Sequence, residues 1–152
     1  MSYLSLLPFL GLVAIVSITG SRFRPEEWYR SLKKPWFTPP GWVFGPVWAI
    51  MYVLIAIAGW LVWRGEGISL TLFVWGAQLV LNMAWSWIMF GRRNIGLALI
   101  DIGLLWASVA LFILLAWPDY PVAAAIFGLY LVWVSFASAL NFRIWQLNSA
   151  AT

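Results

Sequence analysis

The sequence predicts an all-α membrane protein, a bundle of five transmembrane helices. Of its 152 residues, 64% are hydrophobic and only 9% are charged, and the mean hydropathy is +0.90. A soluble domain of this size has too little interior to hide so much apolar surface. A membrane helix needs roughly 20 consecutive apolar residues, and the chain has five apolar runs of about this length. These runs lack the alternation of polar and apolar residues that marks the strands of a membrane barrel. We place the five spans, within one domain of residues 1–152, at about 3–21, 42–63, 69–89, 95–116 and 121–145.

The first run, residues 3–21, has a length that suits either a membrane span or a secretory signal peptide. It lacks a basic start, and Arg22 and Arg24 follow it where a signal peptide would place small residues for cleavage. We therefore expect it to remain in the protein as the first membrane helix.

A long loop, residues 22–41, separates the first two spans and contains a predicted short helix. In the segment RPEEWYRSL, Pro25 suits the first helical position, and Glu26 stands one turn before Arg30, with which we expect it to pair. Such a helix either lies on the membrane surface or folds over the mouth of the bundle as a lid.

The remainder of this loop, KKPWFTPPGW, is stiff, because proline fixes its own backbone and keeps the preceding residue extended. It carries three aromatic side chains, Trp36, Phe37 and Trp42. Rings held at low entropic cost suit packing over an opening. The alternative is an aromatic belt that anchors the second span at the membrane interface.

Aromatic and amide side chains recur at helical spacing on three of the spans. Gln78 and Asn82 are amides at membrane depth, where polar groups are costly and therefore informative. If these stripes face inward, they enclose a pocket with aromatic walls that suits a large, flat, apolar ligand. The alternative is that the amides join helices while the indoles fill the core. The stripes are Trp48 and Tyr52; Trp75, Gln78, Asn82 and Trp85; and Tyr130, Trp133, Ala137 and Asn141.

The fourth span carries Asp101, the one carboxylate at membrane depth in the predicted arrangement. A proton relay would need a second titratable group along its path, so we expect a structural hydrogen bond instead. The chain has no cysteine and no histidine, which removes the thiolate nucleophile and the usual imidazole base, metal ligand and haem ligand. The sequence therefore argues against an enzyme, and we expect no metal site and no required cofactor.

The basic residues are distributed unevenly between the loops. If five spans cross the membrane, eight of the nine lie on the side of the C-terminus and only Arg64 lies on the other. An excess of lysine and arginine marks the cytoplasmic side. We therefore expect a multi-pass protein of a bacterial cell membrane, with its N-terminus outside and its C-terminus in the cytoplasm. The positive charge then reflects topology and contact with the lipid bilayer, and we expect no nucleic-acid partner.

Five motifs occur in order along nearly the whole chain. They are GSRF at 20–23, WYRSLKKPWFTPPGWVFGPVW at 28–48, QLVLN at 78–82, FGRR at 90–93 and FASALNF at 136–142. Together they closely resemble the tryptophan-rich sensory protein family, TspO/MBR, which includes the translocator protein. The ordered set is more specific than any single motif.

The resemblance implies a five-helix bundle, commonly a homodimer. Its implied ligands are porphyrins such as protoporphyrin IX, haem, and also cholesterol-like sterols. The first loop, residues 22–41, would close the pocket, and we call it the lid loop. The resemblance further implies that Trp48 and Asn82 reach polar groups of the ligand, that Trp133 forms a wall, and that Ala137 controls the pocket's shape. The expected ligand-binding residues are Trp48, Tyr52, Gln78, Asn82, Leu104, Trp133 and Ala137, with Trp36, Phe37 and Trp42 in the lid loop.

Three positions depart from the family pattern. Phe37 stands where the family usually has tryptophan, which weakens the case for the light-dependent porphyrin breakdown proposed for some members. Leu97 stands where some relatives have a pocket tryptophan. Phe142 precedes Arg143 where the sterol-recognition pattern needs tyrosine.

The expected function is that of a membrane receptor or sensor for porphyrins that regulates tetrapyrrole metabolism or a stress response. Without histidine, metal-free porphyrin held by stacking, with its propionates near loop arginine or lysine, is favoured over haem. One alternative is a transporter of porphyrin or sterol-like ligands, against which the lack of an internal repeat counts. The other is a light-dependent porphyrin-degrading enzyme.

Overall fold

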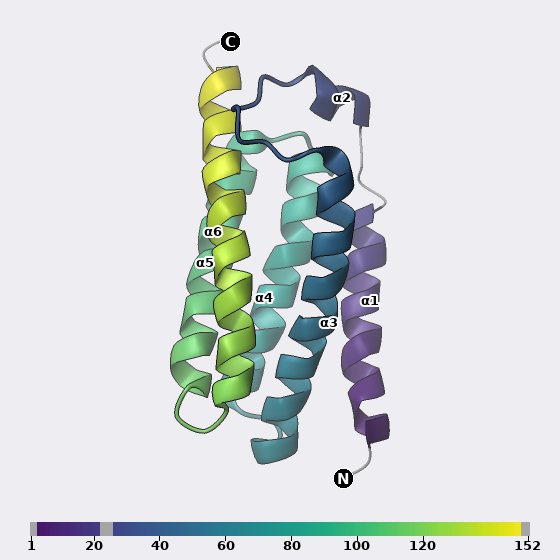
Figure 1. The fold of residues 1–152 in the computed structure, drawn as a ribbon, viewed down its shortest axis with the longest axis vertical. Coiled ribbons are helices and arrows are strands. Elements are labelled where there is room, and N and C mark those ends of the chain that lie inside the picture. The colour runs from purple at the N-terminus through teal and green to yellow at the C-terminus, as the bar shows by residue number, and fades with distance from the viewer. Residues whose placement is uncertain (1–2, 22–25, 150–152) are drawn as a thin grey trace.

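The computed structural model describes residues 3–21 and 26–149, and every regular element in them is a helix. The long helices run side by side as a bundle, with the first and last described residues at opposite ends (Figure 1). The elements are η1 (Tyr3–Leu6), α1 (Leu7–Ser21), α2 (Glu26–Ser31), α3 (Gly41–Glu66), α4 (Leu70–Ser86), η2 (Trp87–Gly91), α5 (Ile95–Ala116) and α6 (Pro121–Ser149).

The bundle confirms an integral, multi-pass membrane architecture. Within the described residues, four stretches are long and apolar enough to cross a membrane: Trp42–Glu66, Leu70–Gly91, Ile95–Ala116 and Pro121–Asn148. The first predicted span is present as a shorter apolar helix, Tyr3–Ile18. By length and composition the structure therefore supports four of the five predicted spans.

Local signals explain where these helices begin and end. Ser69 accepts a hydrogen bond from the Leu72 N–H at 3.2 Å, and the Asn94 side chain accepts one from the Leu97 N–H at 3.0 Å, so α4 and α5 each have an N-cap. At the end of α3, Gly67 has φ of 67°, a left-handed conformation that glycine adopts without strain. Helix α4 continues into the π-turn η2, closed by a bond from the Arg92 N–H to the Trp87 carbonyl at 2.8 Å.

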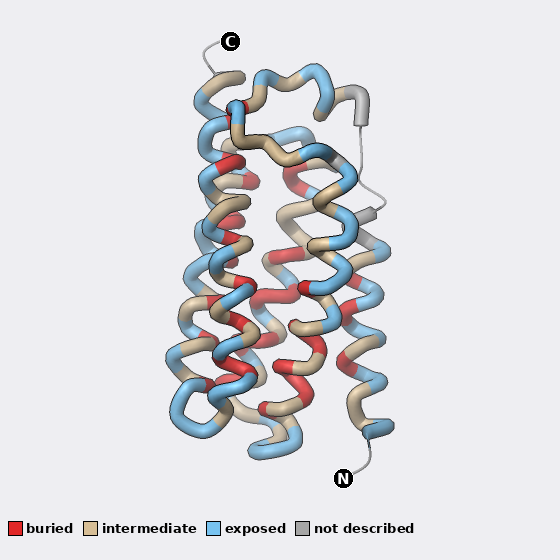
Figure 2. Tube along the Cα trace, in the orientation of Figure 1, coloured by how far each residue is buried: buried red, intermediate tan, exposed pale blue. Residues whose placement is uncertain are grey.

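Buried residues concentrate on the inward faces of the helices (Figure 2). The closest ring contact between described residues lies away from the lid loop, where the rings of Phe112 and Phe127 have centroids 4.0 Å apart. Glycine is required at position 59, because a Cβ there would collide with the indole of Trp75. That indole in turn donates to the Ile55 carbonyl at 2.8 Å.

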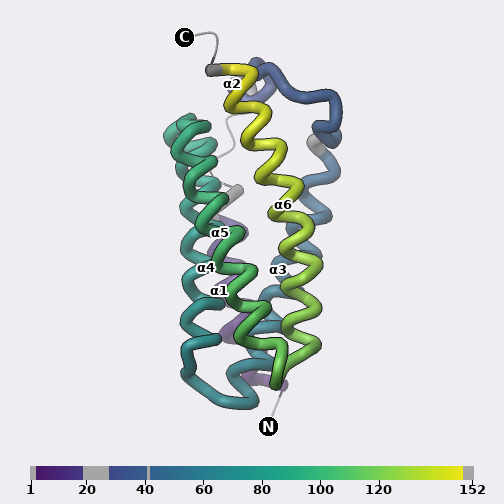
Figure 3. The backbone as a smooth tube through the Cα atoms, turned by 90° about the vertical axis from the view of Figure 1, so that its left-hand side faces the viewer, coloured from purple at the N-terminus to yellow at the C-terminus, as the bar shows by residue number. Residues whose placement is uncertain are grey.

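The predicted short helix is present as α2, and the segment after it crosses the end of the bundle where α6 ends (Figures 1 and 3). Trp28 and Leu32 both pack against the adjoining core. The side chain of Glu26 lies outside the described residues, and so does its expected pair with Arg30.

The structure does not confirm the expectation for Asp101. Its side chain is buried in α5, and its Oδ2 has no hydrogen-bond partner in the described part of the chain. At this oxygen the predicted structural hydrogen bond is not formed.

Candidate functional site

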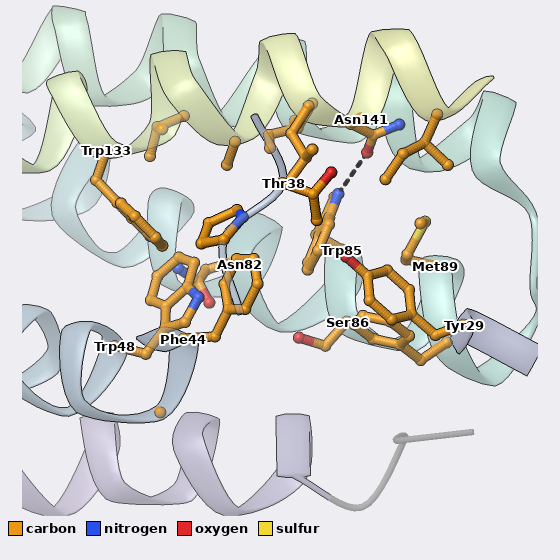
Figure 4. Close-up of a pocket in the computed structure, with 18 of the residues that line it drawn as sticks. Tyr29, Thr38, Phe44, Trp48, Asn82, Trp85, Ser86, Met89, Trp133 and Asn141 are labelled. Atoms are coloured by element: carbon orange, nitrogen blue, oxygen red, sulfur yellow. Dashed lines mark hydrogen bonds between the residues drawn. The ribbon is translucent and has the colours of Figure 1, made fainter. Parts of the chain in front are cut away.

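A cavity of about 750 Å³ opens inside the half of the bundle that the lid loop covers. Side chains from α3, α4 and α6 project into it toward one another (Figure 4). Its size falls in the range of about 300–1,000 Å³ that is typical of small-molecule sites. The lining residues include Tyr29, Arg30, Lys34, Thr38, Pro39, Trp42, Phe44, Trp48, Tyr52, Asn82, Trp85, Ser86, Met89, Leu105, Trp133, Ala137 and Asn141.

The walls of the cavity are aromatic. Trp48 and Tyr52, one turn apart on α3, stack with ring centroids 5.4 Å apart and an interplanar angle of 29°. Trp133 of α6 meets Trp48 edge to face at 6.0 Å, and it meets Phe44 in the same manner at 6.0 Å. These offset and edge contacts are favourable for aromatic pairs, so the walls hold a defined shape.

The floor of the cavity is a chain of hydrogen bonds that links three helices, and we call it the floor network. The Tyr52 hydroxyl donates to Asn82 Oδ1 at 3.0 Å, and Asn82 Nδ2 donates to the Tyr130 hydroxyl at 2.8 Å. Tyr130 donates to Gln78 Oε1 at 2.9 Å. Tyr52 and Asn82 line the cavity, whereas Tyr130 and Gln78 lie behind them with 0% exposure.

A second amide holds the side of the cavity nearer the lid loop. The Trp85 indole donates to Asn141 Oδ1 at 2.9 Å, the bond drawn in Figure 4, and Asn141 Nδ2 donates to the Ile95 carbonyl at 3.2 Å. This pair ties α4 to α6 and to the start of α5. Because Trp85 also meets Phe90 edge to face at 5.6 Å, its ring is fixed on two sides.

The mouth of the cavity is basic. Arg30 and Lys34 line it, and no carboxylate is among the described lining residues. The Lys34 ammonium lies 4.7 Å from the centroid of the Tyr29 ring, a cation–π contact. Burial raises the pKa of Tyr29 above its usual value, so its hydroxyl stays neutral at the mouth.

The lid loop is fastened to the last helix by one amide. Asn148 of α6 accepts a hydrogen bond from the Lys33 backbone N–H at 3.1 Å and donates to the Lys33 carbonyl at 2.9 Å. A ring contact between Phe37 and Phe136, with centroids 6.1 Å apart, supports the same closure. Thr38 and Pro39 follow and face the cavity, so this fastening holds them over it.

The structure brings together most of the residues that the sequence singled out. The cavity is lined by Trp42, Trp48, Tyr52, Asn82, Trp133 and Ala137.

Four other expected residues lie outside the lining. Gln78 is one turn below Asn82 and faces Tyr130. Leu104 is 56% exposed on the outer face of α5, and Trp36 is 94% exposed on the lid loop. Phe37 packs on Phe136 and contributes to closure, not to the cavity surface.

Sequence reasoning missed Phe44, Met89 and the two hydrogen bonds by which Asn148 fastens the lid loop at Lys33, which we call the Asn148 clamp. Phe44 stands one turn before Trp48, so helical spacing could have found it. Asn148 lies beyond the end of the predicted last span and pairs with a residue 115 positions away, for which the sequence carries no local signal.

Comparison with known proteins shows the family of this chain. The model of the TspO/MBR family matches residues 6–146. The chain is 35% identical to the tryptophan-rich sensory protein of Cereibacter sphaeroides, over 97% of this chain and 94% of that protein. It is 37% identical to the translocator protein of Bos taurus, over 95% and 87% of the two chains. It is 36% identical to the tryptophan-rich protein TspO of Archaeoglobus fulgidus, over 98% and 100%. The chain described here therefore belongs to the TspO/MBR family.

Proposed function

We propose that this protein is a membrane receptor that binds porphyrins, such as protoporphyrin IX, and other flat hydrophobic ligands in the cavity beneath the lid loop. The observation that carries the proposal is the cavity itself, with three large rings on its walls and cations only at its mouth. The proteins similar to this chain are named as sensory and translocator proteins, which agrees with a ligand-responsive role in a membrane.

The chemistry of the lining suits a flat macrocycle with carboxylates on one edge. The indole planes of Trp48 and Trp133 meet at 83°. One indole can therefore stack on the face of the macrocycle while the other packs against its edge. Arg30 and Lys34 at the mouth supply charge-assisted hydrogen bonds to carboxylates. A porphyrin therefore enters with its propionates toward the basic end.

The residues present favour metal-free porphyrin over haem. The chain has no histidine and no cysteine, so haem iron would find only weaker ligands such as Met89 or a tyrosine in the cavity. Haem remains a ligand in this proposal, but through its ring and its carboxylates.

We also infer the topology. Helix α1 serves as a fifth crossing, which agrees with the first and last described residues at opposite ends of the bundle (Figure 1). Arg30, Lys33 and Arg143 belong to the end that carries the lid loop, and Arg64 to the other. The positive-inside rule then puts the C-terminus and the lid loop in the cytoplasm of a cell with this protein in its cell membrane. We further propose a homodimer, as the family resemblance implies.

A titration tests the proposed function directly. Full-length protein in detergent is titrated with protoporphyrin IX, haem and a sterol, and the quenching of tryptophan fluorescence is followed. Saturable quenching by protoporphyrin at one site per chain, tighter than by haem or sterol, is expected. Linear, non-saturating quenching by all three compounds would contradict the proposed function.

A further inference from the structure

Gln78 and Tyr130 are polar residues buried behind the cavity, and ligand contact alone does not explain them. Both have 0% exposure, and neither lines the cavity. Buried polar side chains are costly unless they are hydrogen-bonded, and here the bonds lead to two lining residues, Asn82 and Tyr52.

With the amides of Gln78 and Asn82 oriented as they are in the structure, the floor network runs in one direction. Tyr130 has a single hydroxyl proton, which it donates to Gln78 Oε1 at 2.9 Å. Its oxygen is then left to accept, and it accepts from Asn82 Nδ2 at 2.8 Å. This orients the Asn82 amide so that Oδ1 faces Tyr52, whose hydroxyl donates to it at 3.0 Å.

The consequence for the cavity lies at Tyr52. Its only proton is held by Asn82, so the hydroxyl oxygen offers the cavity lone pairs and no donor. Gln78 acts here through its oxygen alone, because its Nε2 is buried without a hydrogen-bond partner among residues 3–21 and 26–149.

We propose that Gln78 and Tyr130 are positioning residues that make the cavity floor at Tyr52 a hydrogen-bond acceptor. The site then favours ligands that carry an O–H or N–H donor on the buried edge, opposite their carboxylates. This inference rests on the proposed function, in which the carboxylates remain at the mouth near Arg30 and Lys34.

Two porphyrins form a matched pair of probes. Haematoporphyrin carries hydroxyethyl groups on the edge opposite its propionates, and the diacetyl analogue carries ketones at the same positions. Ring, charge and size are nearly the same, but only the alcohol can donate. We expect the wild-type protein to bind haematoporphyrin at least about fivefold more tightly, roughly the effect of one net hydrogen bond.

Variants behind the cavity test the positioning role. Tyr130→Phe and Gln78→Leu free the Asn82 amide to turn, and the preference for the alcohol should fall to about twofold or less. Gln78→Glu should keep it, because a protonated carboxyl still offers Tyr130 its carbonyl oxygen as the acceptor, with its O–H in the place of the unused Nε2 donor. Thr71→Val is the matched control, since Thr71 is a buried polar residue of α4 outside the floor network. Size-exclusion profiles and melting temperatures show whether each variant is folded.

The outcomes separate this inference from the function beneath it. If the wild-type protein binds neither porphyrin, the proposed function fails. If it binds both but prefers the ketone or shows no preference, the assignment of an acceptor floor is overturned. An unchanged preference in folded Tyr130→Phe and Gln78→Leu, or its loss in Thr71→Val, overturns the positioning role. If the two disruptive variants do not fold, the wild-type preference and Gln78→Glu still decide.

Discussion

The two ends of the bundle are built from the same helices but are packed differently. At the end away from the lid loop, α3 contributes Met51, Ile55 and Val62 to a closed core. At the covered end, none of residues 42–50 of the same helix is buried, and the space between the helices is the cavity. Rings are present at both ends, but Phe112 and Phe127 pack with centroids 4.0 Å apart in the closed core, whereas Trp48 and Trp133 meet edge to face at 6.0 Å and line the cavity.

Because its two ends are packed differently, a small membrane bundle can keep an open site. The closed end supplies the packing that holds the helices in place, so the open end does not have to close on itself. Hydrogen bonds replace packing around the cavity: the floor network, the Trp85–Asn141 bond and the Asn148 clamp each tie one helix or the lid loop to another. Substitutions at the closed end should therefore change stability, and substitutions at the open end should change binding.

The largest expected effect is on stability, at Gly59. Gly59→Ala places a Cβ inside the indole of Trp75, which must move and give up its bond to the Ile55 carbonyl. We expect a loss of about 1–3 kcal/mol in the free energy of unfolding, typical of an overpacked core. Gly45→Ala at the open end is the matched control, because a Cβ there meets no atom within 4 Å. Thermal melting in detergent measures both, and equal melting temperatures would contradict the contrast between the two ends.

The next effect is on ligand affinity, at Trp48. Trp48→Ala removes a ring that stacks on Tyr52 and forms a wall of the cavity, so porphyrin affinity should fall at least about tenfold. Trp117→Ala removes an indole that is 63% exposed at the far end and should leave affinity unchanged. Ligand absorbance shifts report binding in both variants without relying on the deleted tryptophan. Equal affinities in the two variants would place the ligand elsewhere.

A smaller effect is on the rate of ligand release, at Asn148. Asn148→Ala removes two hydrogen bonds to the Lys33 backbone, each contributing about 0.5–1.5 kcal/mol, and so loosens the lid loop. The dissociation rate should rise about tenfold, as measured by stopped-flow displacement of bound porphyrin. Gln146→Ala, which alters an exposed residue of the same helix, serves as the control. An unchanged rate would mean that ligands leave by a route other than the lid loop.

The smallest effect is on charge recognition, at Lys34. Lys34→Gln should weaken the binding of protoporphyrin by only about two- to fivefold, because exposed ion pairs contribute less than about 1 kcal/mol. It should not change binding of the porphyrin dimethyl ester, which has no carboxylate. Lys33→Gln, whose side chain is exposed and does not line the cavity, is the matched variant. A similar loss for acid and ester would show that Lys34 acts through shape and not charge.

The sequence predicted the helices well because charges and breakers separate long apolar runs. Helix α5 begins at Ile95 and ends at Ala116, as predicted, whereas α6 continues to Ser149, past the predicted end at 145. The extension contains Gln146 and Asn148, polar residues that hydropathy assigns to a loop but that remain helical beyond the apolar run. Boundaries set by hydropathy therefore mark the apolar length of a helix and not its hydrogen-bonded length.

The rotation of each helix was harder to predict than its ends. Polar and aromatic residues fix the phase of α3 and α6, so Trp48, Tyr52 and Trp133 were placed in the cavity correctly. Most residues of helix α5 are apolar, with few polar ones to fix its phase, and there the expected Leu104 faces outward while its neighbour Leu105 lines the cavity. Gln78 shares the stripe of Asn82 but lies a turn deeper, beyond the cavity floor, and depth along a stripe cannot be read from spacing alone.

A structure of the full-length protein with protoporphyrin IX bound tests the proposed site most directly. We expect the macrocycle in the cavity under the lid loop, in contact with Trp48 and Trp133 and with its propionates toward Arg30 and Lys34. A macrocycle bound instead on the outer surface of the bundle, against Trp106 or Trp117, would contradict it.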